Sequence, residues 1–220
     1  MLDYKQAKSY YDRFGSKQDS QAFYEDLAKK RLVAQADFEH ARTVYEFGCG
    51  TGRFADDLLS HHLPAAATYH GVDVSSTMVQ LSQERLARFG DRVQIDQSDG
   101  APKLDAADHS IDRFVASYVL DLLSKEDTRQ LLIEARRVLT LDGCLCLCSL
   151  THGTNVVSRF VTWVWSRLYA IRPMIVGGCR PIELRDYLDE REWKILHQSV
   201  VTGFGVPSEV IVATPAPNRD

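Results

Sequence analysis

The pattern of hydrophobic and polar residues changes near residue 43. Before that point the chain is polar, rich in Lys, Gln and Asp, and its pattern is helical with aromatic residues interspersed. After it, short runs rich in Val, Ile and Leu alternate with helical patterns, for which Ser75 and Ser124 are predicted N-caps. Strands are predicted at 43–48, 68–73, 92–97, 111–119 and 143–150, and helices near 53–62, 76–89 and 125–139. This alternation predicts an α/β fold with a doubly wound, mainly parallel sheet.

The pattern after residue 150 predicts further helices and a final pair of strands. A helix is predicted over 154–172, and Pro181 opens another that ends near Glu190. A short, glycine-containing connection joins strands at 193–201 and 208–214, which favours an antiparallel pair at the sheet edge. We expect one domain over residues 1–220, composed of an N-terminal helical segment, a core, a helical region and a terminal hairpin (1–42, 43–150, 151–192 and 193–214).

Composition and charge narrow the classes of partner. The 220-residue chain has a net charge of -4, which argues against nucleic acid, because that ligand needs a concentrated basic surface. No apolar run reaches the ~18 residues of a membrane-spanning helix. Five cysteines without framework spacing predict a reduced, cytoplasmic protein. No metal site is expected, since Cys144, Cys146 and Cys148 recur at alternate positions, on one face of a buried strand.

Three glycines at alternate positions follow the first predicted strand. Gly48, Gly50 and Gly52 stand between a strand and a helix, where backbone N–H groups can face a polar ligand. A dinucleotide-binding loop needs a glycine at the position that Arg53 occupies. The spacing therefore indicates a nucleotide-type site and weakens an NAD-dependent interpretation.

Two acidic residues extend this pattern. Asp73 ends the second strand, about 20 residues beyond the glycine loop, where a carboxylate can accept both ribose hydroxyls of a nucleoside. Its alternative role is to cap the next helix. Asp99, followed by Gly100, ends the third strand, where it can accept from an exocyclic amino group or simply form a loop turn.

Together these segments resemble the successive motifs of class I S-adenosylmethionine-dependent methyltransferases, in the broad branch that includes ubiquinone/menaquinone-type and other small-molecule enzymes. The resemblance implies a seven-stranded sheet with an antiparallel last strand. It also implies S-adenosyl-L-methionine as cofactor and S-adenosyl-L-homocysteine as product. The matching segments are 46–52, 71–75, 99–100, 112–117 and 136–143.

The resemblance assigns roles around the methionine and ribose parts of the cofactor. Gly48, Gly50 and Gly52 would lie along the methionine part of the cofactor. Glu46 would orient that loop or reach the amino group through water. Asp73 would hold the ribose.

The same resemblance also implies which residues would lie near the adenine and near the sulfur of the cofactor. Val74 and Met78 would lie beside the adenine, Asp99 would bind its amino group, and Gly100 would contact it through the backbone. Ser117, at the end of the fourth strand, would lie near the methionine chain and the reactive sulfur.

The N-terminal aromatic residues resemble a helical lid found in related enzymes. Tyr11 is the preferred residue to close over the cofactor, with Tyr24 as a second candidate. An aromatic stripe that only packs the lid onto the body explains them equally well. The polar cluster 17–19 is interpreted as a solvated helix start.

A sulfonium methyl donor needs alignment and exclusion of water more than acid catalysis. Acceptors that lose a proton also need a base near the methyl group. His152, which follows the fifth strand, is the preferred candidate, although an exposed loop histidine is the competing interpretation. Tyr118 is a weaker catalytic candidate that can also shape the pocket, and Asp121 stands where the related branch often has histidines.

Residues 156–171 are rich in aromatic side chains and favour an apolar small-molecule acceptor, such as a quinone-like ring, terpenoid or lipid. Arg159, Arg167 and Arg172 argue against a membrane-spanning helix. A core helix, an acceptor lid and a weak membrane-surface contact stay open as alternatives.

The preferred function is transfer of a methyl group from S-adenosylmethionine to a small, apolar or aromatic molecule, on an oxygen, carbon or nitrogen atom. Two alternatives are a non-catalytic, cofactor-binding regulatory subunit and an NAD-dependent oxidoreductase. The sequence leaves the acceptor and the oligomeric state open.

Overall fold

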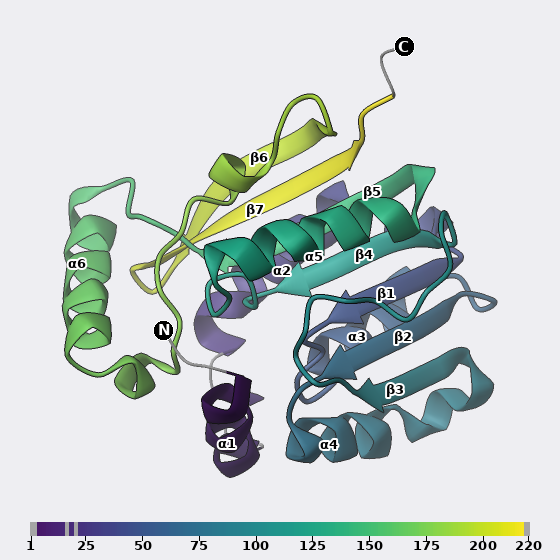
Figure 1. Ribbon diagram of the computed structural model, residues 1–220, viewed down its shortest axis with the longest axis horizontal. Coiled ribbons are helices and arrows are strands. Elements are labelled where there is room, and N and C mark those ends of the chain that lie inside the picture. Colours follow the sequence, from purple (N-terminus) through teal and green to yellow (C-terminus); the bar gives the residue numbers. More distant parts are fainter. Residues whose placement is uncertain (1–3, 16–17, 20–21, 218–220) are drawn as a thin grey trace.

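The computed structural model describes residues 4–15, 18–19 and 22–217. Its centre is a seven-stranded sheet in the order β3-β2-β1-β4-β5-β7-β6 (Figure 1). The strands are β1 (Thr43–Phe47), β2 (Thr68–Asp73), β3 (Val93–Gln97), β4 (Ile111–Ser117), β5 (Leu139–Leu150), β6 (Trp193–Gly203) and β7 (Val206–Pro215).

Strands β1 to β5 pair in parallel, whereas β7 pairs antiparallel with both β5 and β6. The predicted doubly wound sheet with its antiparallel final hairpin is therefore confirmed. The strand order reverses beside β1, since β2 lies on one side of it and β4 on the other. In open α/β sheets a ligand crevice forms at such a reversal, outside the carboxyl ends of the strands.

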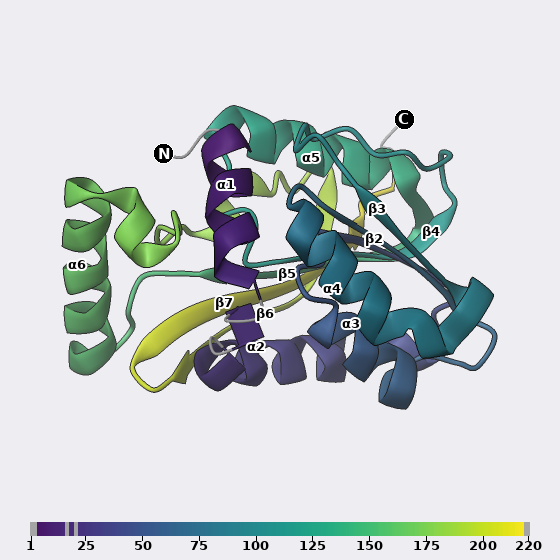
Figure 2. The same cartoon turned by 90° about the horizontal axis from the view of Figure 1, so that it is seen from below.

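Helices cover both faces of the sheet (Figures 1 and 2). One buried cluster joins α2, α3 and α4 to one face, and a second joins α5 and residues 182–188 to the other. The helices are α1 (Tyr4–Phe14), α2 (Ala22–Gln35), η2 (Phe38–His40), α3 (Arg53–Asp57), η3 (Leu58–His62), α4 (Ser76–Leu86), η4 (Ala87–Arg92), α5 (Lys125–Val138), α6 (Val156–Ile171), η5 (Pro173–Val176) and η6 (Leu184–Tyr187).

Polar side chains fix the starts of the main helices. Ser75 accepts a hydrogen bond from the Met78 N–H at 3.2 Å, and Ser124 accepts from the Asp127 N–H at 2.9 Å. These contacts satisfy backbone donors that the first helical turn leaves unpaired, so both predicted N-caps are confirmed.

The helix predicted from Pro181 to Glu190 is wrong. Only the short η6 turn forms there, because the backbone of this segment bonds to the sheet. The Ile182 N–H donates to the Leu150 carbonyl at 3.0 Å, and the Leu184 N–H donates to the Glu209 carboxylate at 2.6 Å. Glu183 and Leu188 have extended backbone on either side of the η6 turn, so no regular helical ladder runs through the segment.

Candidate functional site

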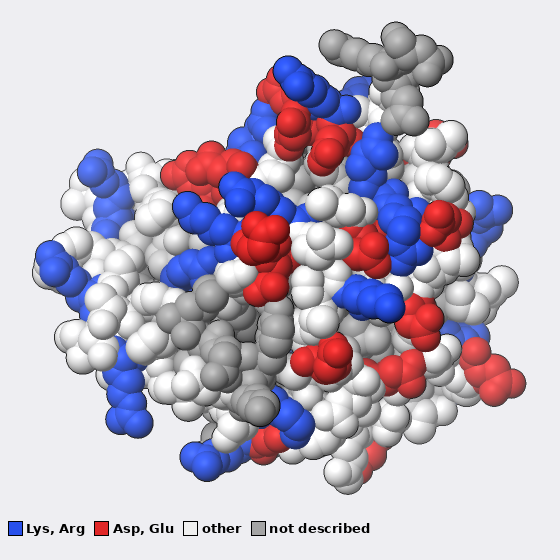
Figure 3. Space-filling view, viewed as in Figure 1, with Lys and Arg blue, Asp and Glu red and all other residues white. Residues whose placement is uncertain are grey.

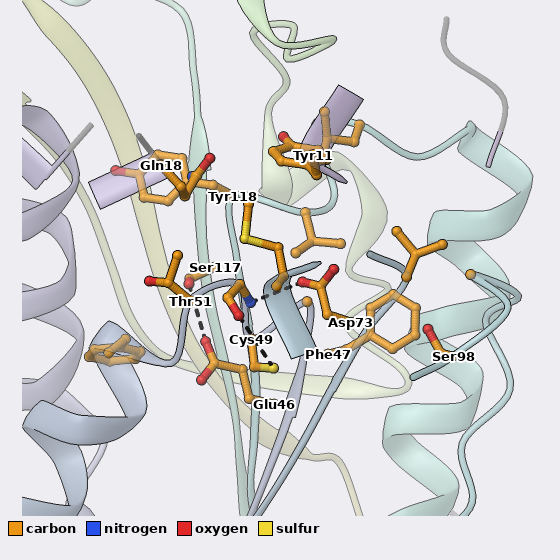
Figure 4. A pocket seen from close by; sticks show the side chains of 18 of the residues that line it. Tyr11, Gln18, Glu46, Phe47, Cys49, Thr51, Asp73, Ser98, Ser117 and Tyr118 are labelled. Atoms are coloured by element: carbon orange, nitrogen blue, oxygen red, sulfur yellow. Dashed lines mark hydrogen bonds between the residues drawn. The ribbon is translucent and has the colours of Figure 1, made fainter. Parts of the chain in front are cut away.

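A cavity of about 340 Å³ opens at the carboxyl ends of β1, β2 and β4, where the strand order reverses (Figure 4). Most of the residues predicted to hold a cofactor line it. They are Tyr11, Glu46, Gly48, Gly50, Asp73, Val74, Met78, Gly100 and Ser117, and Tyr118 lines it as well. The parallel sheet thus brings together residues from three strand ends, as the motifs predict.

The three glycines of the loop all have positive φ, of 79° at Gly48, 55° at Gly50 and 72° at Gly52. A Cβ on Gly48 would lie 2.3 Å from a methyl group of Val119, and one on Gly52 would lie 2.5 Å from the Ser82 hydroxyl. A Cβ on Gly50 would meet no heavy atom within 4 Å. Gly48 and Gly52 therefore serve close packing, whereas Gly50 leaves room in the cavity.

Asp73 holds two neighbouring backbone segments. Its carboxylate accepts from the Gly50 N–H and from the Ser75 N–H, each at 2.9 Å. Burial raises the pKa of Asp73 to about 6, against the lowering effect of these hydrogen bonds. A single carboxylate therefore links the glycine loop to the start of α4 and borders the cavity.

Glu46, the acid that precedes the glycine loop, is almost completely buried. The Tyr69 hydroxyl donates to one carboxylate oxygen at 2.5 Å, and the Ser117 hydroxyl lies 3.5 Å from the other. Burial raises the pKa of Glu46 to about 7, although these hydrogen bonds and the charge of Lys29 lower it. Glu46 can therefore gain or lose a proton near neutral pH.

The sequence analysis missed two charged residues of α2 that line the cavity. The Lys29 ammonium donates to one carboxylate oxygen of Glu25 at 2.7 Å and lies over the rings of Phe54 and Tyr118, 5.7 and 5.9 Å from their centroids. The other oxygen of Glu25 is buried and has no hydrogen-bond partner among the described residues. The spacing of four residues between Glu25 and Lys29 was the only local signal of this pair.

Opposite charges also set the pKa of Lys29. Burial alone would lower the pKa of this ammonium group, but the carboxylates of Glu25 and Glu46 outweigh that effect and raise it. The cavity therefore contains a permanent positive charge between two acids.

The interpretation of residues 17–19 as a solvated helix start is wrong for Asp19, whereas Lys17 lies outside the described residues. Asp19 lines the cavity and accepts from the Thr51 hydroxyl and from the Arg85 guanidinium, each at 2.6 Å. Arg53 forms a second link, because it pairs with Asp26 of α2. These contacts join the N-terminal segment and α2 to the glycine loop, α3 and α4.

Three predicted site residues are not among the described residues that line the cavity: Gly52, Asp99 and His152. Asp99 is exposed and accepts from the Ala101 N–H at 2.9 Å, while the adjacent Ser98 lines the cavity. His152 is exposed just after β5. Their predicted roles in cofactor binding and proton removal stay predictions.

Tyrosines form the wall opposite the glycine loop. The Tyr118 hydroxyl donates to the Ser208 hydroxyl at 2.7 Å, and its ring packs at right angles against Tyr24. Tyr11 lies with its hydroxyl 3.5 Å from the Gly177 carbonyl. Burial raises the pKa of Tyr11 and of Tyr118 well above the ordinary value, so both phenols stay protonated and act as donors.

The backbone at Tyr118 is also unusual. Its φ of 56° lies in a region that residues other than glycine rarely adopt, and such strain is frequent at functional sites. The turn directs Tyr118 into the cavity immediately after β4, beside Ser117 (Figure 4).

The fold and the cavity together define a Rossmann-like α/β protein with a nucleoside-type site at the reversal of strand order. Comparison with solved structures finds the same fold. A chain of the complex between the Haloferax volcanii Trm112 methyltransferase activator and a methyltransferase has a TM-score of 0.72 and 15% identity, over 97% of this chain and 99% of that one. The [4+2]-cyclase SpnF has a TM-score of 0.74 and 16% identity, over 97% of both chains.

The mitomycin 7-O-methyltransferase MmcR has a TM-score of 0.68 and 17% identity, over 90% of this chain and 55% of that one. At such identities these likenesses show the fold alone. A comparison with curated protein sequences finds no significant match.

Residues 44–143 match the family model of the methyltransferase domain. That range contains the glycine loop, Asp73, Asp99 and Ser117. The chain therefore contains a class I S-adenosylmethionine-dependent methyltransferase domain, which implies S-adenosylmethionine as its cofactor.

Proposed function

We propose that this enzyme transfers the methyl group of S-adenosylmethionine to a small, apolar or aromatic molecule. The observation that carries the proposal is the composition of the cavity opposite the glycine loop. There, Tyr11, Tyr118, Leu122 and Leu123 provide an apolar wall, and the carboxylate of Glu25 provides one free acceptor. We call this wall of five residues the acceptor side, and the residues around Glu46, Gly50 and Asp73 the cofactor side.

The cofactor side fits S-adenosylmethionine in shape and charge. The open space at Gly50 lets a ligand approach the loop backbone. Asp73 lies where it can accept from ribose hydroxyls, and Lys29 with Glu46 offers both signs of charge to the zwitterionic end of the methionine part. When bound, this cofactor supplies an electrophilic methyl group on a cationic sulfur.

The acceptor side has to position the acceptor and remove its proton. Alignment of the reacting atoms and exclusion of water supply much of the rate enhancement in such a transfer. Tyr11 and Tyr118 exclude water, and the Tyr11 hydroxyl, which lies 3.5 Å from the Gly177 carbonyl, can donate instead to an acceptor oxygen. The unpartnered oxygen of Glu25 can accept a hydrogen bond from the acceptor and take its proton.

Proton removal by His152 is the competing proposal. Its position at the carboxyl end of β5 supports it, whereas its exposed position outside the cavity lining favours Glu25. Asp121 could also accept a proton near neutral pH, because burial raises the pKa of this carboxyl to about 7. Asp121, however, is fully buried and is not among the described residues that line the cavity.

Two other functions would use the same fold. SpnF is a [4+2]-cyclase, and a non-catalytic regulatory subunit needs only cofactor binding. The experiment that tests the proposal incubates the enzyme with S-adenosylmethionine labelled in its methyl group and a cell extract. Label that depends on the enzyme and partitions into organic solvent supports a small apolar acceptor. Label confined to protein or to polar solutes contradicts it, and cofactor binding without any labelled product favours the alternatives.

A further inference from the structure

Helix α6 presents an apolar face to solvent rather than to the core. Val156, Phe160, Trp163 and Ile171 follow a spacing that places them along one side of the helix, and their exposed fractions are 84%, 64%, 56% and 78%. The rings of Phe160 and Trp163 stack on each other at a centroid distance of 6.1 Å. Single exposed apolar residues are common, but a continuous apolar stripe marks an interaction site.

The apolar surface continues beyond α6. Phe204, in the turn between β6 and β7, is 82% exposed. Its ring packs against that of Phe23 on α2, with the two ring centroids 5.6 Å apart. A Cβ on the neighbouring Gly205 would lie 3.8 Å from Val157 of α6, so this turn adjoins the helix. Three segments far apart in the sequence therefore contribute to one apolar surface, which we call the α6 surface.

The same surface is positively charged. No acidic residue occurs between Asp142 and Glu183, although the whole chain has a net charge of -4. Arg159, Arg167 and Arg172 are exposed, and in the described part of the chain none of them forms an ion pair. In Figure 3 the left margin, where α6 lies, shows blue groups without red ones.

Arg159 and Arg167 adjoin the apolar residues on the helix, whereas Arg172 stands at its C-terminal end. Arg167 occupies the same stripe as Trp163, and its guanidinium lies 5.5 Å from that ring. Exposed aromatic side chains flanked by arginines are typical of helices that lie in the interface of a bilayer. Among the described residues, no helix is long and apolar enough to cross a membrane.

We propose that the α6 surface docks on the surface of an anionic phospholipid bilayer. A second copy of this chain is the less favourable occupant, because a two-fold interface would place arginines of one α6 beside those of the other without an acid to pair them. An anionic lipid headgroup matches the arginines, and the acyl region matches Phe160 and Trp163.

The α6 surface is connected to the cavity. The Trp165 indole N–H donates to the Cys179 carbonyl at 3.0 Å, and the carbonyl of Gly177, two residues earlier, lies 3.5 Å from the Tyr11 hydroxyl. The arrowheads of β1 to β4 point to the side of the molecule on which α1 and α6 lie (Figures 1 and 2). Docking through α6 would therefore bring the cavity side of the sheet towards the bilayer.

The test is co-sedimentation of the full chain with vesicles of pure phosphatidylcholine and with vesicles that also contain phosphatidylglycerol. We expect binding to the anionic vesicles, a blue shift of tryptophan emission on binding, and weakening in high salt. The double variant Phe160→Ala/Trp163→Ala should lose at least about tenfold in vesicle affinity. The matched control Ile133→Ala/Leu141→Ala, which removes exposed apolar residues elsewhere, should bind normally.

Charge reversal separates the electrostatic part of the proposal. Arg159→Glu/Arg167→Glu should lose about tenfold in affinity for anionic vesicles, and its residual binding should no longer weaken in high salt. Equal binding of the natural chain to both kinds of vesicle, or to neither, would overturn the proposal. So would a concentration-dependent dimer in light scattering that Trp163→Ala dissociates, since it would show a second copy as the occupant. Because no acceptor is needed in these measurements, their failure leaves the proposed function untouched.

Discussion

The cofactor side and the acceptor side of the cavity are assembled from different parts of the chain. The cofactor side comes from consecutive strand ends, where register pairs Phe47 of β1 with Val72 of β2 and so places Gly48 beside Asp73. The acceptor side draws Tyr11 and Glu25 from the two N-terminal helices and Tyr118 from the end of β4. The proposed cofactor binding is therefore encoded in short local motifs, whereas the proposed acceptor recognition depends on packing between distant segments.

The largest expected effect tests which residue acts on the acceptor side. Glu25→Gln should lower turnover by about 100-fold or more, because the amide cannot take a proton, while the affinity for S-adenosylhomocysteine stays within a few-fold. His152→Ala should lower turnover by less than about tenfold. Product formation with labelled cofactor measures turnover, and calorimetry measures binding.

If His152→Ala lowered turnover more than Glu25→Gln did, His152 rather than Glu25 would be the residue that removes the proton. If Glu25→Gln instead weakened cofactor binding as strongly as turnover, Glu25 would belong to the cofactor side. Lys29 would then be the link between the two, because it contacts Glu25 directly.

On the cofactor side, Asp73→Asn should weaken S-adenosylhomocysteine binding on the order of 100-fold, since charge-assisted hydrogen bonds to the ribose are lost. The matched control is Asp96→Asn, because Asp96 lies near the same end of the adjacent strand but is exposed and pairs with His70. Calorimetric titration of both variants measures the difference. Equal affinities in the two variants would remove Asp73 from the cofactor site.

The contrast between the two sides also explains what the sequence could predict. The parallel strands, the glycine loop and Asp73 were predictable because each depends on a short run of residues whose backbone demands are visible locally. Glu25 and Lys29 were not, because α2 turns charged side chains inward and its polar pattern resembles that of a solvated helix. Asp19 depends on Arg85, 66 residues away, and no local signal reports that pairing.

The helix predicted after Pro181 failed for a related reason. Its local pattern is acceptable for a helix, but the Leu184 N–H has a partner in Glu209 that only the folded sheet provides. Tertiary contacts override local preference most easily where a segment is short.

Two glycines of one loop provide a test of smaller effects. Gly48→Ala should destabilise the fold by about 2 kcal/mol, because its methyl group would overlap Val119 at a position with positive φ. Gly50→Ala should lose only about 1 kcal/mol from its own positive φ, yet weaken cofactor binding more than tenfold by filling the space at the loop. Urea unfolding and calorimetry separate the two effects. Equal losses of stability would contradict the distinction between packing and binding glycines.

The smallest expected effect concerns the proton on Glu46. Its pKa is about 7 in the folded chain against an ordinary value of 4.5, so between these values the folded state keeps a proton that the unfolded state has lost. Stability from this group therefore falls as pH rises through that window, and the loss is complete above pH 7. Glu46→Gln, which cannot ionise, should stabilise the ligand-free chain by on the order of 1 kcal/mol at about pH 8 and by much less at about pH 5. Urea unfolding at both pH values measures this difference, and an unchanged pH dependence would show that Glu46 stays ionised.

The same variant should weaken S-adenosylhomocysteine binding at about pH 8, because the cationic amino group of the ligand favours the ionised acid. A variant more stable without ligand and weaker in binding would show that the cofactor side maintains a buried charge for binding at the expense of stability.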